Sequence, residues 1–226
     1  KQNSKAPPPL TVTTVFSSPG NDDFTSVTFG SKFRKDAWDW ATRVEYKNAD
    51  TEDRVNLLSD VIHNLDDGQQ LLAKLDVQLT DSDVAETTKA DIQLGYSYRP
   101  VNSRWTVFNR LDLRHSESLS TGFDQTSQKI VNNLNANYIW SDDTQVAFQY
   151  GLKYVVDNFD SDEYRGFTDL YGMEVRHDLS NKWDVGFQGS MYNSYNADVS
   201  DYSYGVSVGY SMARNVWVSL GYNFDG

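Results

Sequence analysis

The chain has 226 residues, a formal net charge of −12 and no cysteine. The acidic balance argues against nucleic-acid binding, which needs a basic surface to neutralise phosphate. The lack of cysteine excludes disulfides, thiolate metal sites and a cysteine nucleophile. Aromatic residues make up 14% of the chain, well above what a solvated acidic chain requires, so we expect these rings to be buried or anchored.

The first nine residues read KQNSKAPPP and contain no apolar core, so they are not a signal peptide. We interpret residues 1–9 as a polar, proline-rich linker and residues 10–226 as one β-barrel domain. No apolar run approaches the roughly 20 residues that a membrane-spanning helix requires. A barrel strand crosses the membrane without such an apolar run, because every second side chain faces lipid and the others face a wet lumen.

From residue 10 onward, short segments alternate apolar with polar residues, and no stretch shows the helical period. The cleanest is 202–212, where Tyr, Val and Met alternate with Ser and Gly. The alternation is weaker in 55–62, 130–140 and 167–175, where an Asn or Asp interrupts the apolar positions. The predicted strands are 25–34, 38–47, 55–62, 71–79, 91–99, 105–114, 130–140, 146–154, 167–175, 183–191, 202–212 and 216–224, with 10–18 as a candidate thirteenth.

The connections between these segments alternate in length. Tight ones, such as 66–68 and 141–143, are predicted to alternate with longer acidic loops at 48–54, 80–87, 116–127, 158–165 and 196–201. Short turns on one side and long loops on the other are typical of outer-membrane barrels. We therefore predict an all-β fold, an antiparallel transmembrane β-barrel of about 12 to 14 strands, closed because lipid does not tolerate open sheet edges.

The polar positions of these strands carry many charges of both signs. They predict lumen-lining residues at Lys32, Arg34, Arg43, Glu45, Lys74, Asp76, Asp91, Arg110, Asp112, Arg114, Lys153, Glu174 and Arg176. One interpretation is a ladder of cross-strand ion pairs, such as Arg43 with Glu45 and Arg110 and Arg114 with Asp112, that fills and stiffens the barrel. The other is a hydrated conduit whose wall charges select solutes.

Aromatic residues recur near the segment ends, where amphipathic rings would meet the membrane–water boundary. The predicted membrane-girdle residues are Trp38, Trp40, Tyr96, Tyr98, Trp105, Trp140, Trp183, Trp217, Tyr222 and Phe224. The alternative is that the same rings fill the core of a soluble β-sandwich.

Catalytic and metal signatures are weak. His115-Ser116 and His177-Asp178 are the only suggestive neighbours of a histidine, and no local motif supports them. The acidic run 158–163 has oxygen ligands for Ca²⁺, but such a run is usually a solvated loop. We predict no catalytic residue, no metal site and no cofactor, and hence a protein that is not an enzyme.

The last quarter of the chain resembles a known family. EVRHDLSNKWDVGFQGSMY at 174–192 and YSYGVSVGYSMARNVWVSLGYNFDG at 202–226, with a weaker echo in GYSYRPVNSRW at 95–105, are similar to the C-terminal outer-membrane β-barrel of large multidomain Gram-negative envelope proteins. The resemblance implies a further loop and a last strand after the GYNF segment. Alternatively, the alternation ending in Tyr222 and Phe224 is similar to the terminal signal of the barrel-assembly machinery.

Together these patterns predict a protein of the bacterial outer membrane. Its expected function is to anchor, or form a conduit for, an associated periplasmic or surface segment. The alternatives are a general or solute-selective porin and a soluble β-sandwich adhesin. The expected partners are outer-membrane lipid and lipopolysaccharide, the barrel-assembly machinery during biogenesis and other subunits of an envelope complex, with no nucleic acid.

Overall fold

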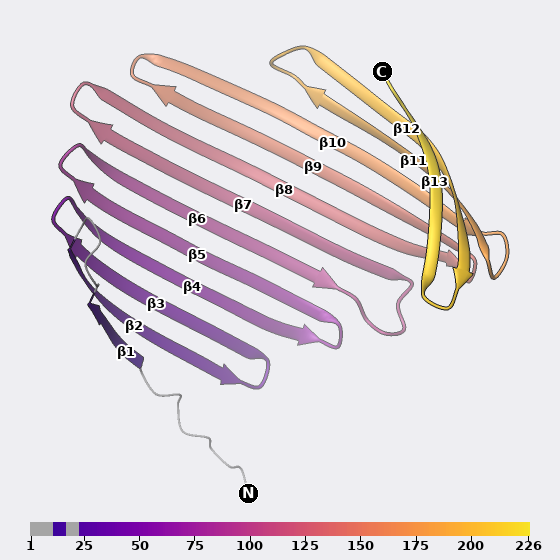
Figure 1. The fold of residues 1–226 in the computed structure, drawn as a ribbon, viewed down its shortest axis with the longest axis horizontal. Coiled ribbons are helices and arrows are strands. Elements are labelled where there is room, and N and C mark those ends of the chain that lie inside the picture. Colours follow the sequence, from indigo (N-terminus) through magenta and orange to yellow (C-terminus); the bar gives the residue numbers. More distant parts are fainter. Residues whose placement is uncertain (1–10, 17–22) are drawn as a thin grey trace, which may run out of the picture.

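The computed structural model of the protein describes residues 11–16 and 23–226, so the predicted linker at residues 1–9 lies outside the described residues. Within those ranges, no helix has the length and apolar character needed to cross a membrane. Thirteen strands form one antiparallel sheet in which each strand pairs with its neighbours in sequence (Figure 1). The strands are β1 (Thr11–Phe16), β2 (Phe24–Lys35), β3 (Trp38–Ala49), β4 (Glu52–Asp66), β5 (Gln69–Ser82), β6 (Ala85–Tyr98), β7 (Trp105–Ser120), β8 (Phe123–Ser141), β9 (Thr144–Phe159), β10 (Asp162–Asp178), β11 (Trp183–Ser194), β12 (Val199–Ala213) and β13 (Val216–Asp225).

The alternation in sequence produces two chemically different faces. Successive side chains of a strand point to opposite faces, and residues directly opposite on neighbouring strands share a face. One row across four strands contains Leu75, Ile92, Leu113 and Ile130, each opposite the next. We call the face that carries this row the apolar face and the other the polar face.

The apolar face is not covered by any other described part of the chain. Val155 is the only buried apolar residue among the described residues, whereas Phe148 on the apolar face is 44% exposed and Leu220 is 82% exposed. A β-sandwich would bury such residues against a second sheet. The soluble-sandwich alternative is therefore wrong, because the described chain forms one sheet with nothing packed on its apolar face.

The predicted difference in connection length is also wrong. At one end of the sheet the connections are 36–37, 67–68, 99–104, 142–143, 179–182 and 214–215, and at the other end they are 50–51, 83–84, 121–122, 160–161 and 195–198. The predicted long loops are largely strand, closed by short turns in which Gly122 (φ 84°) and Asp160 (φ 50°) adopt left-handed backbone. Antiparallel pairing continues past the region where sequence alternation is clear.

We name the two ends by their residues. All six tryptophans of the chain lie near the first set of connections, which we call the tryptophan end. The second set, where the predicted acidic loops lie, is the acidic end.

The sheet is curved but not closed, which differs from the predicted closed barrel. β1 and β13 form its two edges and lie far apart in Figure 1. In an antiparallel meander every odd-numbered strand runs in the same direction, so β1 and β13 are mutually parallel. An antiparallel ring needs an even number of strands, and the thirteen described here cannot form one by pairing their edges.

Candidate lumen wall on the polar face

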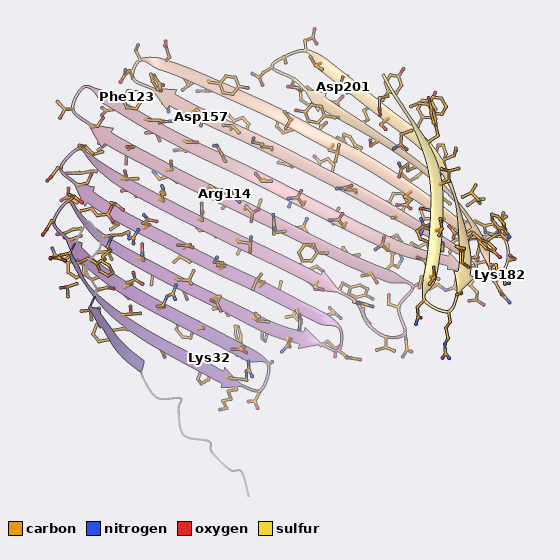
Figure 2. All side chains as sticks on the ribbon, viewed as in Figure 1. Lys32, Arg114, Phe123, Asp157, Lys182 and Asp201 are labelled. Carbon is orange, nitrogen blue, oxygen red and sulfur yellow. The ribbon has the colours of Figure 1, made fainter. Side chains whose placement is uncertain are left out.

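The strand register places all thirteen predicted lumen-lining residues on one face of the sheet. The registers from β2 to β11 connect them through directly opposed positions, for example Gly30 with Arg43 and Lys74 with Gln93. Arg114 lies near the middle of the sheet, and Lys32 lies toward the tryptophan end (Figure 2). The thirteen charged residues therefore share one face, which also carries apolar side chains such as Leu72 and Val155.

The charges on this face form ion pairs both within and between strands, but many charged side chains have no such partner. Arg110 pairs with Asp112 at 3.2 Å within β7. Arg176 on β10 pairs with Asp184 on β11 at 3.6 Å, and Lys47 on β3 pairs with Glu52 on β4 at 3.0 Å. The expected Arg43 pair with Glu45 is not among the ion pairs of residues 23–226. Much of the polar face thus consists of separate side chains that are open to solvent.

Three cations on neighbouring strands have no ion-pair partner within residues 23–226: Arg114 on β7, Lys129 on β8 and Lys153 on β9. Arg114 is directly opposite Lys129. Lys129 is opposite Val155, two residues along β9 from Lys153. Lys129 lies outside the predicted strand 130–140, which begins seven residues after the start of β8 at Phe123, so the alternation does not assign Lys129 to a face.

The wall over β10 to β13 has small side chains instead. One row across these strands contains Arg176, Gly186, Ser207 and Gly221. Its neighbouring row toward the tryptophan end contains Gly209 between Asp184 and Ser219. Apart from Arg176, the residues of the first row carry no side chain larger than a serine hydroxymethyl group.

Eight of the ten predicted girdle aromatics occupy the apolar face. Register places eight of them there: Trp38, Trp40, Tyr96, Tyr98, Trp105, Trp183, Tyr222 and Phe224. Trp140 lies at an irregularity of β8, and its ring meets that of Tyr138 edge to face, with centroids 6.2 Å apart.

Trp217 does not belong to this set. It is opposite Ser211 on the polar face, and its indole Nε1 donates a hydrogen bond to Asp184 Oδ2 at 2.8 Å. The guanidinium of Arg176 lies over its ring, 5.1 Å from the centroid. Trp217 therefore contributes to the polar wall, because its place in the β13 alternation is that of Ser219 and Gly221.

The polar residues that interrupt the apolar face form hydrogen bonds there. Asn109 and Asn132 are linked to each other through their side-chain amides, at 3.2 and 3.3 Å. The carboxylate of Asp169, only 4% exposed, accepts hydrogen bonds from Asn193 at 2.7 Å and from Tyr195 at 2.9 Å. Such pairing removes most of the cost of placing these groups on an apolar surface.

The histidine neighbours do not form catalytic pairs. His115 and Ser116 are consecutive in β7 and therefore point to opposite faces, as do His177 and Asp178 in β10. His63 stacks on Trp38, with ring centroids 3.8 Å apart. Across the residues that the structure describes, no three His, Cys, Asp or Glu side chains are arranged to hold a metal ion.

No protein-family model matches the chain. The search of curated proteins gives no match either. Among solved structures, the RagAB peptide importer in its closed-closed state matches with a TM-score of 0.59 and 8% identity, over 89% of this chain and 36% of that chain. The outer-membrane channel DcaP of Acinetobacter baumannii matches with a TM-score of 0.55 and 8% identity, over 89% and 78%.

The present chain therefore spans about a third of the importer chain and most of the channel. At these identities the similarity concerns the fold alone. The fold is that of bacterial outer-membrane β-barrel proteins, as the sequence alternation predicted, and the thirteen strands fall within the predicted 12 to 14.

Proposed function

We propose that this outer-membrane β-barrel forms a water-filled conduit for small polar solutes, with the apolar face against lipid and the polar face as the lumen wall. The observation that carries the proposal is the contrast between the two faces. Large apolar side chains such as Leu220 remain exposed on one face, while Arg114 and Lys153 remain exposed and unpaired on the other, within residues 23–226. A lipid-facing exterior and a hydrated interior account for both.

The small residues of β10 to β13 support a conduit over a filled anchor. Gly186, Ser207 and Gly221 have small side chains or none, so they leave space in the proposed lumen that larger side chains at these positions would fill. The similar structures include a channel and a peptide importer. Their activities are consistent with a conduit in this chain but do not specify its solute.

A conduit in lipid requires a closed ring. We propose that the edges of β1 and β13 pair with an odd number of further strands, since only an even total gives an antiparallel ring. Outer-membrane lipid and lipopolysaccharide would then surround the apolar face, and the barrel-assembly machinery would insert the protein.

The anchor is the second candidate, and it rests on the resemblance of residues 174–192 and 202–226 to C-terminal barrels of large envelope proteins. Immunoblotting of outer-membrane fractions with an antibody to this barrel tests that relation. A single polypeptide far larger than 25.7 kDa supports it, whereas a band near that mass contradicts it.

Conductance separates the conduit from the anchor. Full-length protein purified from outer membranes and inserted into planar bilayers is expected to give a large, steady and ohmic conductance. Heat-modifiable migration on gels provides the control that the inserted protein is folded. If the folded protein inserts but does not conduct, the conduit is contradicted, and an anchor whose lumen is filled is favoured.

A further inference from the structure

We propose that Arg114, Lys129 and Lys153 form a binding site for the phosphate or carboxylate group of an anionic solute on the lumen wall. This inference deepens the proposed function, since it takes the polar face as the wall of a conduit. Arg114 supplies a planar guanidinium with several donors, and the two lysines supply mobile ammonium groups. The site is marked as Arg114 near the centre of the sheet in Figure 2.

The first argument is that the three cations are adjacent. Arg114 and Lys129 are directly opposite on β7 and β8, and Lys153 on β9 is a diagonal neighbour of Lys129. Directly opposed residues have Cβ atoms about 5 Å apart, and like charges at that spacing destabilise a sheet. A site that holds an anion between them offsets this repulsion.

The second argument is that two of the nearby carboxylates, Asp112 and Asp157, interact with other residues. Asp112 is 3% exposed, pairs with Arg110 at 3.2 Å and accepts a hydrogen bond from Gln93 at 2.8 Å. Asp157, the other diagonal neighbour of Lys129, accepts a hydrogen bond from Ser127 at 2.5 Å. Neither carboxylate therefore forms an ion pair with the three cations.

The third argument concerns the row of directly opposed residues that contains Asp76, Asp91, Arg114 and Lys129. Charges of like sign are neighbours along this row. Asp91 faces Arg114 from β6, but Asp91 also lies opposite Asp76 on β5. Asp76 and Asp91 thus occupy this row on β5 and β6, and Arg114 and Lys129 occupy it on β7 and β8, whereas Lys74 and Lys89 lie two residues from the acids on the same face. A structural ion-pair ladder would alternate the signs along the row, whereas this row places two cations side by side.

The direct test is binding of inorganic pyrophosphate to the full-length, detergent-folded protein by isothermal titration calorimetry at low salt. We expect saturable binding that Arg114→Gln and Lys129→Gln each weaken about tenfold or more, as the loss of one charge-assisted hydrogen bond implies. Lys182→Gln is the matched control, because Lys182 lies in the connection between β10 and β11 (Figure 2). No saturable binding, or an equal loss in Lys182→Gln, overturns the site.

Stability provides a second readout. If the cations serve a ligand, Lys129→Gln should unfold at an unchanged or higher temperature without pyrophosphate, because it removes a like-charge contact. A lower unfolding temperature would indicate a structural role and contradict the site.

Conductance distinguishes failure of the site from failure of the conduit. Pyrophosphate is expected to reduce the current of the wild type and to do so about tenfold less potently with Lys129→Gln. Binding without any conductance would retain the site and overturn the conduit, whereas conductance without binding would retain the conduit and overturn the site.

Discussion

The indole of Trp217 on β13 donates a hydrogen bond of 2.8 Å to Asp184 on β11, across the intervening strand β12. The contact passes over Gly209, which lies opposite both Asp184 and Ser219. A Cβ at position 209 would lie 2.6 Å from the indole nitrogen and would also collide with the Asp184 carboxylate. Glycine at this position thus allows two strands to interact that are not neighbours in the sheet.

Gly209→Ala is therefore expected to destabilise the barrel by about 1–3 kcal/mol, through steric strain and loss of this contact. Urea unfolding of the protein in lipid vesicles, followed by tryptophan fluorescence, measures the change. The matched control is Gly189→Ala in β11, where a Cβ would meet only the carbonyl oxygen of Ser203, at 3.9 Å. Equal unfolding midpoints for the two variants would show that Gly209 is not required for close approach.

The strand pattern and the two faces could be predicted from sequence because the side-chain period of a strand is two. Alternation assigned residues as distant as Lys32 and Arg176 to one face, and the register agrees. Trp217 was assigned with the girdle aromatics, because an aromatic residue beside a tight turn matches their composition. The alternation of β13 already places Trp217 with Ser219 and Gly221 on the polar face, and the hydrogen bond to Asp184 shows its role there.

The acidic end could not be predicted in the same way. Strands there continue through residues such as Ser116, Glu117 and Ser118, where both faces carry polar side chains and alternation gives no signal. Asp, Ser and Thr also favour turns, so composition predicted loops. Lys129 lies at this boundary, which is why the cluster of three cations was only partly predicted from the sequence.

The second prediction concerns the hydrogen bonds that Asp169 accepts on the apolar face. Asn193→Leu removes the amide that donates to Oδ1 at 2.7 Å and leaves a buried carboxylate short of one donor. We expect a clear loss of stability in vesicle unfolding, larger than that of Ser200→Ala, which removes only the hydroxyl bound to Asn193.

A double variant provides the control for this prediction. Asp169→Leu with Asn193→Leu removes both polar groups from the apolar face, so it should recover much of the stability that Asn193→Leu loses. Additive losses in the two single variants and the double variant would mean that the Asp169–Asn193 interaction contributes nothing.

The assignment of the faces can be tested with two adjacent residues of β8. Leu134 lies on the apolar face, opposite Asn109 and Tyr150, and Asn133 lies on the polar face, opposite Arg110 and Gly151. Leu134→Arg should cost about 2–4 kcal/mol, as a charge facing lipid near the bilayer midplane does. Asn133→Arg should cost less, because its side chain enters the proposed hydrated lumen and meets only the like charge of Arg110, which costs less than about 1 kcal/mol. Unfolding in lipid vesicles measures both losses of stability. A larger loss for Asn133→Arg than for Leu134→Arg would mean that the two faces are assigned the wrong way round.

Two glycines with left-handed backbone differ in what surrounds them, and this difference predicts unequal effects of the same substitution. Gly122 (φ 84°), in the β7–β8 turn, has open space where a Cβ would be, so Gly122→Ala should cost about 1 kcal/mol from backbone strain alone. Gly68 (φ 70°), in the β4–β5 turn, would place a Cβ 2.6 Å from the backbone nitrogen of Pro100, and its carbonyl accepts a hydrogen bond of 2.6 Å from the Arg99 amide. Gly68→Ala must therefore displace the connection between β6 and β7 and is expected to cost at least about 2 kcal/mol. Vesicle unfolding of both variants measures the difference, and equal losses would mean that Gly68 is required only for its backbone conformation.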